Sequence, residues 1–233
     1  MNESGGVKLT VDAVVFDLDG TLIDSLDVYC KILNSAFERV GLPAASRKNI
    51  LRAIQEGGFI WDFVLPEQME SRKEVLISKV RGVIDEIYPR RFRKEIKMIE
   101  GADKVLKRIA ARGMKIGLVT STPRTFLEDK LYPLKLAGIE DVFEVIITPD
   151  DIQNKKPAAD PLIECGKRLG VTRDKIAYIG DTRIDMQAGR AAGMKTIGVL
   201  TGNDTYQDLM AENPEAVIQS VCELGNVIPL DLK

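Results

Sequence analysis

The 233-residue chain contains no histidine. This absence excludes a Ser-His-Asp or Cys-His catalytic relay, a histidine-ligated zinc site and a phosphohistidine intermediate. Any acid–base chemistry that the protein performs must therefore use carboxylates, lysines or tyrosines.

Cysteine is scarce as well. The chain has three cysteines, Cys30, Cys165 and Cys222, without the spacing of a metal site, so we expect no disulfide framework. None is followed six residues later by arginine, which excludes the phosphate-binding loop of the cysteine phosphatases. We predict that all three are small, buried apolar residues.

Long apolar runs are also missing. No stretch approaches the ~18 residues that a transmembrane helix needs. The first ten residues, MNESGGVKLT, lack the apolar segment of a signal peptide and are typical of a frayed tail. We therefore predict a cytoplasmic protein with no membrane partner, and a net charge of −2 gives no indication of a nucleic-acid partner.

Short apolar runs alternate with amphipathic helices along most of the chain. Five runs are too short for helices and predict buried strands over residues 13–16, 116–119, 145–147, 176–179 and 196–199. Helices that each end at a glycine are predicted over residues 102–111, 161–169 and 184–192. Strands that alternate with single helices predict an α/β fold, a Rossmann-like open parallel sheet covered on both faces.

The segment between the first two predicted strands breaks this alternation. Residues 24–97 hold no convincing buried strand but contain long amphipathic stretches, notably Pro66 to Tyr88. We predict an inserted α-helical cap over this segment and a core formed by residues 1–23 and 98–233. Residues 26–98 carry 14 Lys and Arg against 10 Asp and Glu, a net charge of +4. This excess fits either a solvated surface or a basic lid that attracts an anionic substrate.

Two aspartates follow the first predicted strand, in Asp17-Leu18-Asp19-Gly20-Thr21. Ligands of an open parallel sheet bind outside the carboxyl ends of its strands, and Gly20 permits a turn that lets both carboxylates face the same crevice. Neighbouring carboxylates repel each other unless a cation compensates their charge. Mg²⁺ fits this site because it prefers oxygen ligands and keeps water ligands that a phosphate can replace. The alternative is an acidic turn with a purely geometric role.

Three further segments lie after later strands or before helices. Val119-Thr120-Ser121 ends the second predicted strand and offers a hydroxyl and backbone amides at the same sheet edge. Lys155-Lys156-Pro157 precedes a helix, and lysine is a common point charge for phosphate. Gly180-Asp181-Thr182 follows the fourth strand, with Asp185 four residues later. Alone, each also fits a structural role: a helix N-cap, an exposed charge, or acids at the positive end of a helix.

In this order, the four segments resemble the motifs of the haloacid dehalogenase-type (HAD) superfamily. The resemblance runs from about Val14 to Leu200 and places the predicted insert where the family's C1 caps lie. The run from Asp17 to Ser25, DLDGTLIDS, is similar to the phosphoglycolate phosphatase and β-phosphoglucomutase branch. One departure is Ala159, where such proteins usually have a second proline. That proline starts a helix and does no chemistry, so the lysine assignment is unaffected.

The resemblance implies a role for each residue of the motifs. Asp17 would attack phosphorus and form an aspartyl-phosphate, and Asp19 would act as general acid and then as general base. Thr120 and Lys156, with backbone amides near Asp19 and Ser121, would hold the transferring oxygens.

The resemblance also implies a set of magnesium ligands. One oxygen of Asp17, the main-chain carbonyl of Asp19 and the carboxylate of Asp181 would bind Mg²⁺. Asp185 would orient a metal-bound water from the second shell of the site.

These roles predict magnesium-dependent hydrolysis of a small phosphorylated metabolite. The presence of Asp19 argues against a dehalogenase, because the dehalogenases of the superfamily attack carbon and lack this second aspartate. A phosphomutase shares every motif, and a catalytically idle binding protein on this fold is a further alternative. A phosphonate hydrolase would need a desolvated cap lysine, for which the candidates are Lys31, Lys48, Lys73 and Lys79.

Overall fold

The structure is a computed structural model that describes residues 8–55, 59–66 and 72–230. It divides into two compact units, a core unit of Met1–Asp24 with Lys97–Lys233 and a helical unit of Ser25–Ile96. In the described part of the chain, no helix is long and apolar enough to cross a membrane. The cytoplasmic location stays a prediction.

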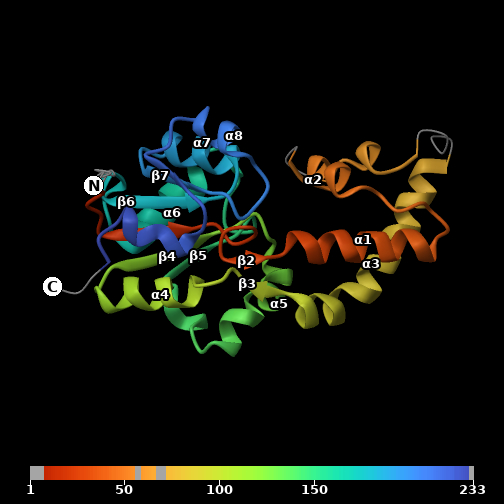
Figure 1. Cartoon of the computed structure of the whole chain (residues 1–233), viewed down its shortest axis with the longest axis horizontal. Coiled ribbons are helices and arrows are strands. Elements are labelled where there is room, and N and C mark those ends of the chain that lie inside the picture. Colours follow the sequence, from red (N-terminus) through yellow and green to blue (C-terminus); the bar gives the residue numbers. More distant parts are fainter. Residues whose placement is uncertain (1–7, 56–58, 67–71, 231–233) are drawn as a thin grey trace, which may run out of the picture. The chain divides into compact units, whose positions relative to one another are not determined.

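The core unit is built on a six-stranded parallel sheet in the order β5-β4-β1-β6-β7-β8. The strands are β1 (Ala13–Phe16), β4 (Lys115–Val119), β5 (Val145–Ile147), β6 (Ile176–Gly180), β7 (Lys195–Val199) and β8 (Ala216–Ile218). β1 lies in the middle, between β4 and β6 (Figure 1). The predicted open parallel α/β fold is confirmed. β8 was not predicted from the sequence; it lies at the sheet edge and buries only Ile218.

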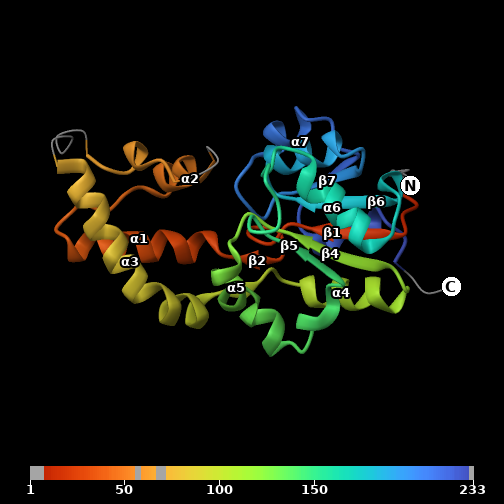
Figure 2. The same cartoon turned by 180° about the vertical axis from the view of Figure 1, so that it is seen from behind.

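Helices cover both faces of this sheet. α4 and α5 lie on one side and α6 and α7 on the other (Figures 1 and 2). The core helices are α4 (Ala102–Ala111), α5 (Arg124–Leu136), α6 (Asp160–Leu169), α7 (Arg183–Ala191) and α8 (Tyr206–Met210). The glycines that follow the three predicted helices, Gly113, Gly170 and Gly193, have φ angles of 68°, 66° and 72°, as expected for left-handed helix ends.

The face under α6 and α7 holds a continuous apolar cluster. Val15 and Tyr178 from the strands pack with Leu162 of α6 and Ala188 of α7, and all four are fully buried. A β-carbon at Gly117 would lie 2.7 Å from the Sγ of Cys165, so this glycine lets α6 approach β4 closely. The packing fixes the strand ends from which the site residues project.

The chain passes between the two units through a short antiparallel pair of strands. β2 (Ile23–Asp24) pairs with β3 (Lys97–Met98). At the amino-terminal end, residues 1–7 lie outside the described residues, but Leu9 is buried and its N–H donates to the carbonyl of Val227 at 2.8 Å. The prediction of a frayed tail is therefore wrong for Leu9, whose side chain is part of the core.

Among its described residues, the helical unit contains α1 (Leu26–Arg39), α2 (Arg47–Gln55), a 3₁₀ turn at Trp61–Phe63, and α3 (Lys73–Glu95). α1 packs along α3, and apolar residues of all three helices form one cluster that includes Phe37 of α1, Ile50 of α2 and Val80 of α3.

The helix predicted over Pro66–Tyr88 differs in extent from α3. It begins at Lys73, with residues 67–71 outside the described residues, and it continues through Pro89 to Glu95. The rings of Tyr88 and Phe92 stack with centroids 4.7 Å apart, and this contact supports the helix across the proline. Val75, an apolar residue of the predicted amphipathic stretch, is 58% exposed.

The prediction that all three cysteines are buried is only partly right. Cys165 is buried where α6 packs against the sheet, Cys30 is half-buried and Cys222 is exposed. Cys222 lies in a surface 3₁₀ helix, Val221–Asn226, that turns Val221 and Leu224 inward instead.

Candidate active site

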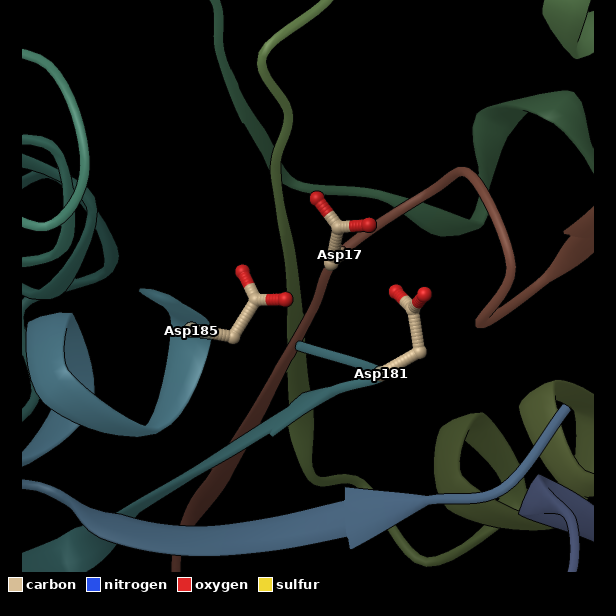
Figure 3. Close-up of side chains that lie close together, drawn as sticks. All are labelled: Asp17, Asp181 and Asp185. Carbon is tan, nitrogen blue, oxygen red and sulfur yellow. The ribbon is translucent and has the colours of Figure 1, made fainter. Parts of the chain in front are cut away.

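Three buried aspartates converge at the carboxyl ends of two neighbouring strands. Asp17 follows β1, Asp181 follows β6, and Asp185 lies in the first turn of α7. β1 and β6 pair directly, with Phe16 opposite Ile179, so the two strands deliver their next residues to one place. One carboxylate oxygen of each aspartate lies within 4.8 Å of the others, and Figure 3 shows the three side chains close together.

Glycines make room for these carboxylates. A β-carbon at Gly20 would lie 2.5 Å from Asp181 Oδ2, and the φ of Gly20 is +77°, a conformation that other residues rarely adopt. A β-carbon at Gly202 would overlap the same oxygen. The backbone therefore wraps tightly around Asp181.

Lys156 joins the acidic cluster. Its Nζ donates to Asp17 Oδ1 and Asp185 Oδ1, both at 2.7 Å, and to the hydroxyl of Tyr178 at 3.0 Å. The Tyr178 hydroxyl in turn donates to Asp185 Oδ1 at 2.8 Å. The Lys156 side chain is only 5% exposed. The structure thus brings together four residues that the sequence analysis singled out, and adds Tyr178 beneath them.

The four charged groups perturb one another. Burial, together with the charges of Asp185 and Asp19, raises the pKa of Asp17 to about 7 even though Lys156 opposes the shift. Burial and the neighbouring Asp17 and Asp185 charges also hold the pKa of Asp181 well above its usual range. Burial acts in the same sense on Asp185, but the charge and hydrogen bond of Lys156 outweigh it, so the pKa of Asp185 is lowered.

This donor set fits a divalent cation. Three buried carboxylates lie close together beside one lysine, and two of them have raised pKa values, so a bound cation would stabilise their charged forms. The donors are all oxygens, as hard cations such as Mg²⁺ or Ca²⁺ require. A buried acidic cluster that could hold a metal ion is therefore present.

Thr120 and Ser121 follow β4, the other neighbour of β1. Thr120 is buried, and its Oγ1 accepts a hydrogen bond from the N–H of Thr122 at 3.1 Å, while Ser121 is exposed. Within the described residues, neither side chain is hydrogen-bonded to the aspartate cluster. The structure places both residues at the same sheet edge, where the N–H of Thr120 donates to the carbonyl of Ile147 at 3.1 Å.

Asp19 has a partner that the sequence analysis missed. Its Oδ2 accepts hydrogen bonds from Lys130 Nζ at 2.5 Å and from Thr122 Oγ1 at 3.0 Å. Lys130 lies on α5, three residues after Leu127 and four before Leu134, both of which are buried. A lysine at that spacing falls on the inward stripe of a helix, and this was the signal available in the sequence.

Comparisons with known proteins agree with this geometry. A family model described as haloacid dehalogenase-like hydrolase matches residues 14–199. The phosphoglycolate phosphatase of Yersinia pestis is 30% identical over 221 residues, 94% of each chain. That of Escherichia coli K12 is 28% identical over 232 residues, covering 92% of this chain and 91% of that protein.

Solved structures show the same fold. The crystal structure of a predicted phosphoglycolate phosphatase from Haemophilus somnus superposes with a TM-score of 0.81 at 20% identity, covering 93% of this chain and 97% of that one. Together with the family model and the named relatives, this confirms the expected enzyme class, a HAD-type phosphatase. The chain belongs to the haloacid dehalogenase-like hydrolase family.

Proposed function

We propose that the protein hydrolyses small phosphate monoesters with Mg²⁺, through an aspartyl-phosphate formed on Asp17. The observation that carries this proposal is the pairing of Asp17 with Lys156 beside Asp181, with Asp19 two residues further along the same loop. A nucleophilic carboxylate, a buried cation and a metal-binding acid then meet at one strand end, as phosphoryl transfer requires.

The magnesium ion would be held by Asp17, Asp181 and the main-chain carbonyl of Asp19. Asp185 already accepts four hydrogen bonds, from Lys156, from Tyr178 and from the amide and hydroxyl of Thr182. Its oxygens are therefore committed, and it is better suited to orienting a metal-bound water and Lys156 than to binding the ion directly. When bound, the ion neutralises the carboxylates and polarises the phosphoryl oxygens.

In the first step, a carboxylate oxygen of Asp17 attacks phosphorus. The bond from phosphorus to the leaving oxygen breaks, its electron pair goes to that oxygen, and Asp19 supplies the proton. Water then attacks the aspartyl-phosphate and gives its proton to Asp19. The bond between phosphorus and Asp17 breaks, which releases inorganic phosphate and restores both carboxyl groups to their starting state.

The transferring oxygens would be held by donors on two sides. Lys156 supplies a buried positive charge. Its hydrogen bonds to Asp17, Asp185 and Tyr178 hold its Nζ beside the Asp17 carboxylate. Thr120 and the backbone amides near Ser121 and Asp19 supply further donors. Groups that are fixed before the reaction stabilise developing charge without reorganising.

The candidate substrates are small phosphorylated acids and sugars. The two named relatives are phosphoglycolate phosphatases, and we propose 2-phosphoglycolate as the first compound to try. The surroundings of Lys31 argue against its use as the Schiff-base lysine of a phosphonate hydrolase, because its side chain is 57% exposed and its Nζ lies 3.4 Å from Glu95 Oε2. A Schiff-base lysine needs the opposite environment, a desolvated one.

The test is release of inorganic phosphate by the purified protein, with magnesium and with EDTA. The substrates are p-nitrophenyl phosphate and three alkyl phosphates: 2-phosphoglycolate, glycerol 3-phosphate and glucose 6-phosphate. We expect magnesium-dependent release from p-nitrophenyl phosphate and from at least one alkyl ester. No release from any of the four would contradict the proposal, and isomerisation of the sugar phosphate without phosphate release would identify a mutase.

A further inference from the structure

Lys130 is a buried lysine that the proposed reaction does not use. Its side chain is 7% exposed on α5, outside the four motifs. Lysine is rarely buried to this extent unless it is paired. Its ion-pair partner is Asp19, the residue to which the proposed reaction gives both proton transfers.

The contacts around Asp19 form a closed triangle. Lys130 Nζ donates to Asp19 Oδ2 and to Thr122 Oγ1, both at 2.5 Å, and Thr122 Oγ1 donates to the same Asp19 Oδ2 at 3.0 Å. Thr122 is itself buried and lies just after the end of β4. Both donors reach one carboxylate oxygen, so the two oxygens of Asp19 are not equivalent.

Asp19 needs such support. It lies on the turn after β1, next to Gly20, and its side chain is 26% exposed, whereas that of Asp17 is 9% exposed. A general acid must lie within hydrogen-bond reach of the leaving oxygen, and a small rotation of a short side chain removes it from that position. The triangle removes the rotational freedom of the carboxyl group.

We propose that Lys130 and Thr122 position the Asp19 carboxyl group for proton transfer by holding its Oδ2 in place. Lys130 is therefore a positioning residue for the phosphatase reaction. This inference rests on the proposed function. A purely structural alternative is that the ion pair only ties α5 to the loop after β1, and the two readings differ in what the loss of Lys130 does to different substrates.

The experiment compares Lys130→Met with Lys135→Met, which makes the same change at an exposed position of the same helix. Activity is measured on p-nitrophenyl phosphate, whose leaving group needs little protonation, and on the alkyl phosphate that the wild type turns over fastest. We expect Lys130→Met to lower kcat about 100-fold on the alkyl ester but only about threefold on p-nitrophenyl phosphate, because acid catalysis matters most for basic leaving groups. Lys135→Met should match the wild type on both.

Two further variants separate positioning from folding. Thr122→Val, which keeps the side-chain shape, should show the same substrate dependence with a smaller loss. In an Asp19→Ala background, Lys130→Met should add less than about twofold on either substrate, because the group it positions is gone. Thermal melting of each variant reports whether it is folded.

The outcomes are distinct. Equal losses on the two substrates, no loss at all, or a full additional loss in the Asp19→Ala background would each overturn the positioning role while the wild type remains an active phosphatase. Failure of the proposed function would appear earlier, as a wild type without magnesium-dependent activity, and would overturn this inference with it.

Discussion

The core unit and the helical unit treat polar side chains in opposite ways. Among the described residues, every buried polar or charged side chain except Ser25 belongs to the core unit. The helical unit has an apolar interior, and at its surface Arg47 pairs with Asp27 and Arg52 lies over the ring of Phe63. Burying a charged side chain costs free energy unless other groups compensate it. The buried charged side chains of the core unit are therefore the ones to which we assign a function. Substitution of the buried charged residues of the core unit should impair the chemistry, and substitution of the surface cations of the helical unit should only shift substrate preference.

The largest effect should follow from Asp17→Asn. We expect kcat to fall at least about a thousandfold, because the amide can neither attack phosphorus nor bind the metal as a carboxylate does. Thermal melting should show that the variant is folded. Asp12→Asn, at the exposed residue before β1, is the matched control and should retain full activity. If Asp17→Asn kept more than about a hundredth of wild-type turnover, a nucleophilic role would be wrong.

Asp19→Ala should come next, with a loss that depends on the substrate. General acid catalysis contributes about 10²–10⁴-fold, and it contributes most when the leaving group is basic. We therefore expect a loss of about a thousandfold on an alkyl phosphate and a clearly smaller one on p-nitrophenyl phosphate, both measured as kcat. The same loss on both substrates would indicate a metal-binding or structural role for Asp19 instead.

The stability of the metal-free protein should depend on the Asp17 carboxyl group. Burial raises the pKa of Asp17 from 3.8 to about 7, so between these pH values the folded protein binds more protons than the unfolded chain. Stability is then lost as the pH rises through this window, by on the order of 2 kcal/mol. Urea unfolding in EDTA at pH 4.5 and pH 7.5 measures the change, which should be smaller in Asp17→Asn. Equal pH dependence in both proteins would count against the raised pKa.

The smallest effects should come from the cations of α2. Arg47 and Arg52 already have partners in the helical unit, whereas Lys48 is exposed and forms no ion pair with a described residue. We expect Lys48→Ala to raise KM severalfold for 2-phosphoglycolate but not for p-nitrophenyl phosphate, and Arg47→Ala and Arg52→Ala to change neither. If none of the three variants changed KM for 2-phosphoglycolate, these cations would have no role in recognising a second anionic group.

Much of the fold and most of the motif residues could be predicted because their signals are local. β1 and β6 are apolar runs followed at once by Asp17 and Asp181, and parallel pairing brings their ends together. The missed features depend on tertiary packing. α5 contains Pro133 and α3 contains Pro89, and a proline normally interrupts a helix, yet both helices continue because neighbouring side chains are packed. Because α5 was not predicted, the inward position of Lys130 on this helix, and with it the contact to Asp19, was not predicted either.

The central place of β1 also affects how the protein is made. Synthesis proceeds from the amino terminus, so all residues of the helical unit have been synthesised once Ile96 has emerged. At that point β4 and β6, the strands that pair with β1, have not yet been synthesised. During that interval the apolar strand Ala13–Phe16 has no partner on either edge, which makes it a natural site for a chaperone or for aggregation. Asp17 meets Asp181 only after β6 has been translated. A nascent chain that stops before Gly180 therefore contains the nucleophile but not the site, and catalytic competence is gained late in translation.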